Sequence, residues 1–132
     1  MREVAERWLI FAYDDLRAAR AVFDKQLHNQ ACFHAQQCVE KSLKAVLAFE
    51  GAGVPRTHSI SELMRTVSSA AFSVRHADLV SMDDYYIATR YPDALPGTLP
   101  SGLPTLADAE QAIEVAVFAF ERAIEVTGVD PR

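Results

Sequence analysis

The apolar residues of this chain recur at the spacing of amphipathic helices, and no segment shows the strict alternation of a surface strand. Between Glu3 and Phe23 they form a stripe about 100 degrees wide on one side of a helix. The stripe consists of Ala5, Trp8, Ala12, Leu16, Ala19 and Phe23. The stretch DKQLHN, residues 24–29, interrupts this pattern, so we expect the first helix to end there and Asn29 to cap the next one.

The second predicted helix continues to Glu50 and stops at Gly51. One stripe of this helix should face the core, and it contains Ala35, Val39, Ser42 and Val46. The opposite side is mostly polar, and it contains Phe33, Gln37, Glu40, Lys41 and Lys44. Leu43 and Leu47 widen the apolar surface, so we expect more than one neighbour to cover this helix.

Two further helices are predicted before a long loop. Ser59 and Glu62 have the spacing of a capping box, which marks the start of the third helix. The fourth is expected over residues 75–90, ending before Pro92. Its inward stripe should contain Leu79, Met82 and Tyr86. Four prolines and two glycines in residues 91–104 then predict a loop.

A last helix is predicted from Thr105, paired with Asp108 as its cap, to about Thr127. The sequence therefore predicts an all-α fold, an antiparallel up-and-down bundle of about five helices. Hydrophobic residues make up 50% of the chain and charged residues 23%, which is typical of a folded domain. We expect residues 1–132 to form one domain.

Composition limits the cellular setting. No apolar run approaches the roughly 18 residues that a membrane span requires. The N-terminal residues MREVAERW lack the apolar centre of a signal peptide, so a cytoplasmic protein without membrane contact is expected. Cys32 and Cys38 are six apart in one helix, about 120 degrees around its axis, where they cannot bridge each other. Free buried thiols are predicted.

Charge is distributed unevenly along the chain, whose net charge is −5. Residues 1–23 balance at zero, and six basic against four acidic residues leave 24–75 at +2. Three basic against ten acidic residues leave 76–132 at −7. This distribution argues against a broad basic face for nucleic acid but leaves room for a small basic site.

Two charged residues fall where the helical pattern predicts core. Asp15 lies on the inward stripe of the first helix, and an ionised carboxylate there needs a partner or water. Either a structural pair with Lys41 or Lys44, or a ligand-facing role, is open at this point. Arg90 points inward at the end of the fourth helix, either to compensate the helix dipole or to contact a ligand.

Other candidate chemistry is weaker. His34 and Cys38 are four apart, but no second pair completes a tetrahedral metal site, so no metal is expected. The chain has no glycine-rich phosphate loop, HExxH motif or nucleophile elbow, so no cofactor is expected. Phe118 with Val115, and Ile10 with Tyr13, fall on outer helix faces, which predicts association into a homodimer.

Four short groups of residues follow one another along the chain at suitable separations. They are Trp8 with Asp15-Leu16, Gln36-Gln37-x-x-Glu40-Lys41-x-x-Lys44, Thr57-His58-x-Ile60-x-x-Leu63 and Arg90-Tyr91-Pro92-Asp93. Together they resemble the HEPN domain family, small helical bundles found in prokaryotes beside minimal nucleotidyltransferases. The resemblance covers nearly the whole chain.

This resemblance implies a dimeric bundle similar to the substrate-binding helical domain of kanamycin nucleotidyltransferase. It implies nucleotide or RNA as ligand and a separately encoded minimal nucleotidyltransferase as partner, in a toxin-antitoxin pair. Ligand contacts are expected from Asp15, Gln37, Glu40, Lys41, Lys44, His58, Arg90 and Tyr91. Ribonuclease members carry an Arg followed, after four to six residues, by a His. Here residues 95–97 are Leu, Pro and Gly, and no other Arg has a His at that spacing.

Three functions follow from these observations. The first is a non-catalytic subunit in which Lys41, Lys44 and Arg90 hold phosphate. In it, Tyr86 or Tyr91 stacks on the base, and Asp15 or Glu40 accepts from the base's amino edge. The second is a ribonuclease toxin with a variant site of Arg90, His58 and Tyr91. The third is a protein-interaction module whose polar residues only hold the bundle together.

Overall fold

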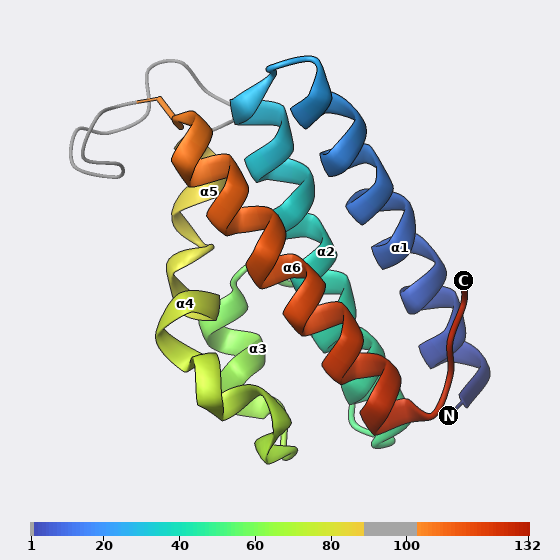
Figure 1. Cartoon of the computed structure of the whole chain (residues 1–132). Helices are drawn as coiled ribbons and strands as arrows, with labels where there is room; N and C mark the ends of the chain where they lie inside the picture. The colour runs from blue at the N-terminus through green and yellow to red at the C-terminus, as the bar shows by residue number, and fades with distance from the viewer. Residues whose placement is uncertain (1, 89–102) are drawn as a thin grey trace.

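The computed structural model describes residues 2–88 and 103–132, and within these ranges every regular element is a helix. Three long helices form most of the molecule: α1 (Arg2–Asp24), α2 (His28–Phe49) and α6 (Leu106–Thr127). The shorter elements are α3 (Ile60–Thr66), the 3-10 helix η1 (Ala70–Arg75), α4 (His76–Ser81) and α5 (Asp84–Ala88). The predicted all-α antiparallel up-and-down bundle is confirmed, with six α-helices in the described residues (Figure 1).

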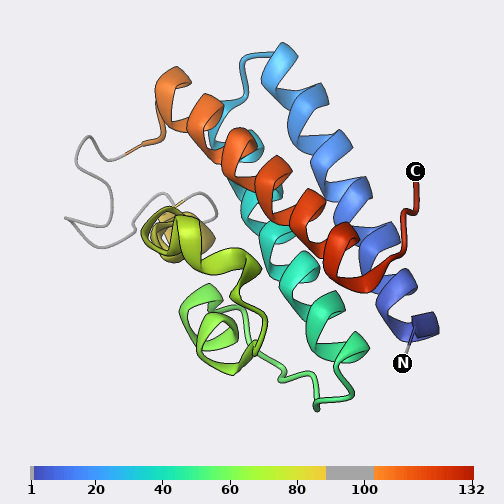
Figure 2. The same ribbon diagram turned by 60° about the horizontal axis from the view of Figure 1, so that its bottom comes forward.

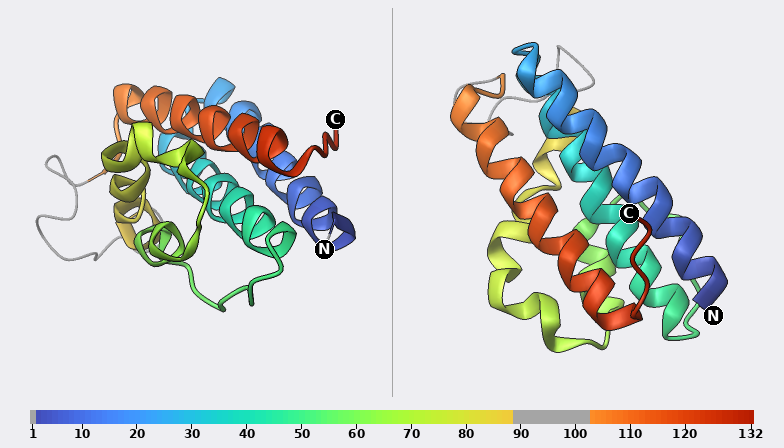
Figure 3. Two further views of the ribbon diagram at one scale, coloured as in Figure 1. Left: turned by 90° about the horizontal axis from the view of Figure 1, so that it is seen from below. Right: turned by 45° about the vertical axis from the view of Figure 1, so that its right-hand side comes forward.

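The chain reverses direction along the bundle. Helix α1 runs one way, α2 returns beside it, the segment from α3 to α5 leads back, and α6 runs in the direction of α2 (Figures 1 and 2). Helix α2 occupies the centre, between α1 on one side, α6 on another and the α3–α5 segment on a third (Figure 3). Both termini lie at the same end, where Arg2 Nη2 donates to the carbonyl of Gly128 at 3.3 Å.

Small residues allow the three long helices to pack closely. Fully buried alanines face one another across the α1–α2–α6 contacts, because an alanine lets two helix backbones approach. They include Ala5, Ala12, Ala19, Ala31, Ala35, Ala45, Ala109, Ala112, Ala116, Ala119 and Ala123. Larger buried side chains, among them Leu9, Leu43, Leu47 and Phe120, fill the space between them.

The central position of α2 buries part of its polar side. Fourteen of its 22 residues are buried, including Glu40 at 2% exposure and Lys44 at 6%. Both residues lie opposite the Ala35 stripe, but they are covered, because the α3–α5 segment packs on a flank of α2 that a helical wheel of α2 alone does not place. Leu43 and Leu47 are buried, as predicted.

The turn between α1 and α2 also differs from prediction. Gln26 adopts a left-handed backbone (φ 63°) and donates its N–H to the carbonyl of Phe23, while Leu27 donates to Val22. These two bonds close α1 as a Schellman motif without glycine. Leu27 then occupies the N-cap of α2 without a side-chain bond, so the predicted cap Asn29 lies inside the helix.

The predicted helix over 75–90 is interrupted in the structure. Residues 70–75 form η1, and α4 and α5 are separated at Met82 and Asp83. Asp83 leaves the helical pattern because its carboxylate accepts from the Ile60 and Ser61 amides, at 2.6 and 3.0 Å, and from Ser61 Oγ at 2.7 Å. The side chain thus caps α3 from outside, beside the predicted cap Ser59, whose Oγ accepts from Glu62 N.

This break changes which tyrosine faces inward. Leu79 and Met82 are buried as predicted, but Tyr85 rather than Tyr86 completes the buried set, and Tyr86 is half-buried. The predicted continuation to Arg90, and most of the predicted 91–104 loop, fall outside the described residues.

Helix α6 begins and ends as predicted. Thr105 and Asp108 form a reciprocal capping box, and Gly128 closes the helix with φ 70°. The predicted outer patch on this helix was wrong: Val115 is buried, and the half-buried Phe118 ring lies between the guanidiniums of Arg75 and Arg122. On α1 the apolar surface consists of Ile10 and Phe11, since Tyr13 stacks on Phe120.

No helix within residues 2–88 and 103–132 combines the length and apolar composition that crossing a bilayer requires. Cys32 and Cys38 are both buried and free, as predicted.

Asp83→Ala should destabilise the fold by roughly 2 kcal/mol, because it leaves two amides at the start of α3 without their acceptor. Urea denaturation followed by circular dichroism measures the change. Asp84→Ala is the matched control, since Asp84 is exposed and makes no comparable bonds to α3. Equal midpoints for the two variants would contradict the capping role of Asp83.

The two thiols should be inert in the folded protein. Burial raises the pKa of Cys32 and of Cys38 to about 12, so almost no thiolate is present at mildly alkaline pH. Labelling with a thiol-specific disulfide reagent at that pH should proceed only after denaturant is added. Rapid labelling of either thiol in the native state would show that the α2 core opens readily.

Candidate functional site

One flank of α2 carries a connected set of polar side chains between α1 and the α3–α5 segment. We refer to this set as the polar face. It comprises Asp15 of α1, residues His34, Gln37, Glu40, Lys41 and Lys44 of α2, His58 before α3, and Tyr86 of α5. The α2 members recur three and four residues apart, which places them in one row along the helix.

Asp15 binds two groups of α2 at once. Its Oδ1 accepts from His34 Nδ1 at 2.9 Å, and its Oδ2 accepts from Lys41 Nζ at 2.5 Å. The aspartate side chain is 12% exposed, whereas those of His34 and Lys41 are 29% and 24% exposed. Of the alternatives that the sequence left open, the pair of Asp15 with Lys41 forms, and the two donors reach the surface while the carboxylate lies beneath them.

Glu40 organises the second half of the polar face. Its Oε2 accepts from Lys44 Nζ at 3.0 Å, and its Oε1 accepts from His58 Nδ1 at 3.2 Å and Gln37 Nε2 at 3.3 Å. The Lys44 ammonium also lies 5.3 Å from the centre of the Trp8 ring. Since Glu40 and Lys44 are both buried, they support the surface groups and do not reach solvent themselves.

Aromatic and imidazole rings connect the two halves. His58 stacks on Tyr86 with centroids 4.5 Å apart and planes 16° apart. Tyr86 lies 6.5 Å from Phe33, whose ring meets His34 edge-on at 5.3 Å. The four rings form a row with an imidazole at each end. A pocket of about 260 Å³, lined by His58, Ser59, Asp83 and Tyr86, opens at the His58 end.

The structure brings together six of the eight residues predicted to contact a ligand. They are Asp15, Gln37, Glu40, Lys41, Lys44 and His58. Arg90 and Tyr91 lie outside the described residues. His34 was not predicted as a site residue, because its position four residues before Cys38 suggested only that the two could be metal ligands. Its spacing of seven residues from Lys41, two helical turns, was the available signal that both face Asp15.

The suggested pairing of His34 with Cys38 does not form. Cys38 Sγ contacts the carbonyl of Ala116 in the core at 3.9 Å, while His34 turns to Asp15. Among the residues that the structure describes, no group of three or more histidine, cysteine or carboxylate side chains is placed to hold a metal ion.

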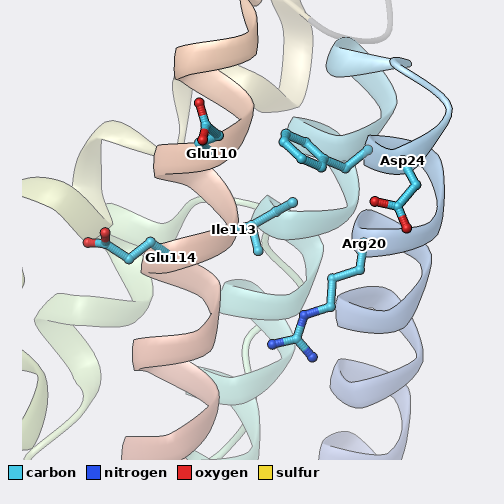
Figure 4. Close-up of a pocket in the computed structure, with 6 residues that line it drawn as sticks. Arg20, Asp24, Glu110, Ile113 and Glu114 are labelled. Carbon is cyan, nitrogen blue, oxygen red and sulfur yellow. The ribbon is translucent and has the colours of Figure 1, made fainter.

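A second pocket lies between α1 and α6, and no sequence pattern predicted it (Figure 4). It measures about 320 Å³ and is lined by Arg20, Phe23, Asp24, Glu110, Ile113 and Glu114. Glu114 is directed away from α1 and pairs with Arg75 at 2.9 Å. Asp24 and Glu110 outnumber the single Arg20, so this pocket disfavours phosphate, and the polar face is the stronger candidate.

Comparisons with known proteins agree with the helical bundle described above. A family model described as HEPN domain matches residues 5–125. The crystal structure of TT1696 from Thermus thermophilus has a TM-score of 0.80 at 31% identity, covering 92% of this chain and 97% of that one. ST0689, described as an archaeal HEPN homologue, has a TM-score of 0.74 at 32% identity, covering 93% and 97%.

A curated relative is a candidate toxin, MJ1304 of Methanocaldococcus jannaschii. It is 29% identical over 121 residues, which are 83% of this chain and 79% of that protein.

Lys44→Met should cost about 3–5 kcal/mol of folding free energy, because it leaves the buried Glu40 carboxylate without its ammonium. The double variant Glu40→Gln, Lys44→Met should recover much of this loss. Lys25→Met, at an exposed lysine in the α1–α2 turn, is the control and should change the unfolding midpoint little. If Lys44→Met behaves like Lys25→Met, water rather than Glu40 satisfies the ammonium.

Proposed function

Because the chain belongs to the HEPN domain family, we propose that it binds a nucleotide at the polar face and presents it to a separately encoded minimal nucleotidyltransferase. In this proposal the partner carries out the transfer chemistry, and the two proteins form a toxin-antitoxin pair. The relationship to a candidate toxin supports that setting.

The observation that carries this proposal is the position of the exposed groups above buried carboxylates. A bundle of this size can be stabilised by apolar contacts alone, and replacing a buried ion pair by apolar residues is often neutral or stabilising. Here two carboxylates are held below the surface, and each supports a histidine and a lysine. Such an arrangement fixes surface donors in place before a ligand arrives, which lowers the entropic cost of binding.

The two ends of the polar face suit different parts of a nucleotide. Lys41 and His34 are the exposed donors at the Asp15 end, where they can meet phosphate oxygens. His58, whose side chain is 58% exposed, offers a ring to a base at the other end, beside the pocket that it lines with Tyr86. On the sequence alone, Arg90 and Tyr91 are proposed as further contacts.

The proposal also includes a homodimer. Ile10 and Phe11 are exposed on α1 at 41% and 57%, and Phe11 lines an apolar pocket of about 200 Å³ with Val4, Arg7 and Trp8. Trp8 connects this surface to the polar face through Lys44. A second copy packed here would lie close to the nucleotide.

Calorimetric titration of the chain with ATP, GTP and a short RNA should give measurable heat for at least one of them. Lys41→Met should weaken binding about tenfold or more, because it removes a charged phosphate contact. The affinity should also fall as salt concentration rises.

Lys25→Met serves as the control for charge, and His58→Ala compared with His76→Ala separates the polar face from an exposed histidine of α4. Absence of heat with every ligand, both alone and with the co-purified nucleotidyltransferase, would rule the proposal out. Equal losses in Lys25→Met and Lys41→Met would place binding elsewhere.

A further inference from the structure

The pocket between α1 and α6 shares no residue with the polar face. The two helices lie together near the chain termini, where Arg2 contacts Gly128, and they diverge toward the opposite end of the bundle (Figure 1). The pocket occupies the wide end of this wedge, between the last turns of α1 and the first turns of α6. Its volume of about 320 Å³ is at the small end of the range for ligand pockets, which suits a molecule of amino-acid size better than a nucleotide.

The deepest part of the pocket is apolar. Phe23 and Ile113 are half-buried and pack against the core, whereas the charged side chains around them are exposed. Ile113 is directed from α6 toward α1 (Figure 4). The ring of Phe23 contacts the ring of His28 at 6.4 Å, which supports it from the α2 side. An apolar group of a ligand would therefore meet a surface that the fold already holds in place.

Three charged side chains at the rim have no partner within the part of the chain that the structure describes. Arg20, Asp24 and Glu110 make neither an ion pair nor a side-chain hydrogen bond there. Arg20 and Asp24 are one turn apart, a spacing that permits an ion pair, yet none forms. Asp24 also ends α1, where the helix dipole favours a cation, and the last turn of α1 has no basic residue. Lys25 follows it without pairing with it.

We propose that this pocket binds a free α-amino acid with an apolar side chain. The ammonium of the ligand lies between the carboxylates of Asp24 on α1 and Glu110 on α6, and its carboxylate accepts from the guanidinium of Arg20. Its side chain packs on Phe23 and Ile113. This ligand is of a different chemical class from the nucleotide, and the proposal does not depend on the polar face.

The mixture of charges at the rim selects this class of ligand. A simple anion would meet two carboxylates, and a simple cation would leave the Arg20 guanidinium unpaired beside it. An uncharged apolar molecule would take water from all three charges and return no hydrogen bond to them. A zwitterion with an apolar body satisfies the rim and the apolar surface together.

The test is a titration of the full chain with L-phenylalanine, followed by calorimetry and by the NMR signal of the Ile113 δ1 methyl group. A dissociation constant of about 1 mM or below is expected for a ligand of this size. The Ile113 signal should shift because the ligand ring lies against it, while that of Ile124, at the other end of α6, should stay in place. Phenylpropionate lacks the ammonium, phenethylamine the carboxylate and alanine the ring, so each should bind about tenfold more weakly or worse.

Two variants assign the rim residues. Arg20→Met should weaken phenylalanine binding about tenfold and leave phenethylamine binding unchanged, because phenethylamine has no carboxylate for the guanidinium to hold. Glu110→Gln should weaken phenylalanine binding similarly without weakening that of phenylpropionate. Arg65→Met on α3 and Glu121→Gln on α6 replace exposed residues outside this pocket, so they are the matched controls and should bind like the parent chain. All four positions are exposed, so thermal midpoints should stay close to the parent value.

The outcomes decide the proposal independently of the nucleotide-binding role. Neither heat nor an Ile113 shift with phenylalanine at about 10 mM overturns it. Equal affinities for phenylalanine and phenethylamine overturn it in favour of a site for simple cations. Equal losses in Arg20→Met and Arg65→Met overturn it by placing the ligand elsewhere. Lys41→Met, which tests the polar face, should leave phenylalanine binding unchanged, so each proposal can fail while the other holds.

Discussion

The pair of Glu40 with Lys44 in the buried part of α2 is the interaction on which the polar face depends. Each of these two buried charges would be strongly destabilising without the other. Lys44 binds Oε2 of Glu40, which leaves Oε1 to accept from His58 and Gln37. The pair is buried because α2 is enclosed by α1, α6 and the α3–α5 segment. Packing at the centre of the bundle thus decides which polar groups reach the surface, and the surface groups are held from below.

Helix periodicity predicted most of this fold. The three long helices, the Thr105 cap and the Gly128 end follow from local spacing and capping rules, which act over a few residues. The division of the fourth segment was not predictable in this way. Asp83 leaves the helix for amides more than twenty residues earlier in the chain, and such a long-range bond has no signature in the residues around it.

The candidate site was predictable as a set of residues but not as an arrangement. The pattern around Gln37, Glu40, Lys41 and Lys44 identified the correct helix, and the buried Asp15 indicated that a partner was needed. Whether Lys41 or Lys44 pairs with Asp15 depends on the offset between α1 and α2, which one sequence does not reveal. His34 was not predicted, although its spacing of two helical turns from Lys41 places both on one side of α2.

The cap formed by Asp83 also links stability to site geometry. His58 directly precedes the N-cap of α3, and Tyr86 follows Asp83 by three residues, so one carboxylate sets the spacing between the two stacked rings. If α3 frays, the His58 imidazole leaves both Glu40 and Tyr86. Hydrogen exchange at the Ile60 and Ser61 amides consequently reports the fraction of molecules in which this end of the polar face is assembled.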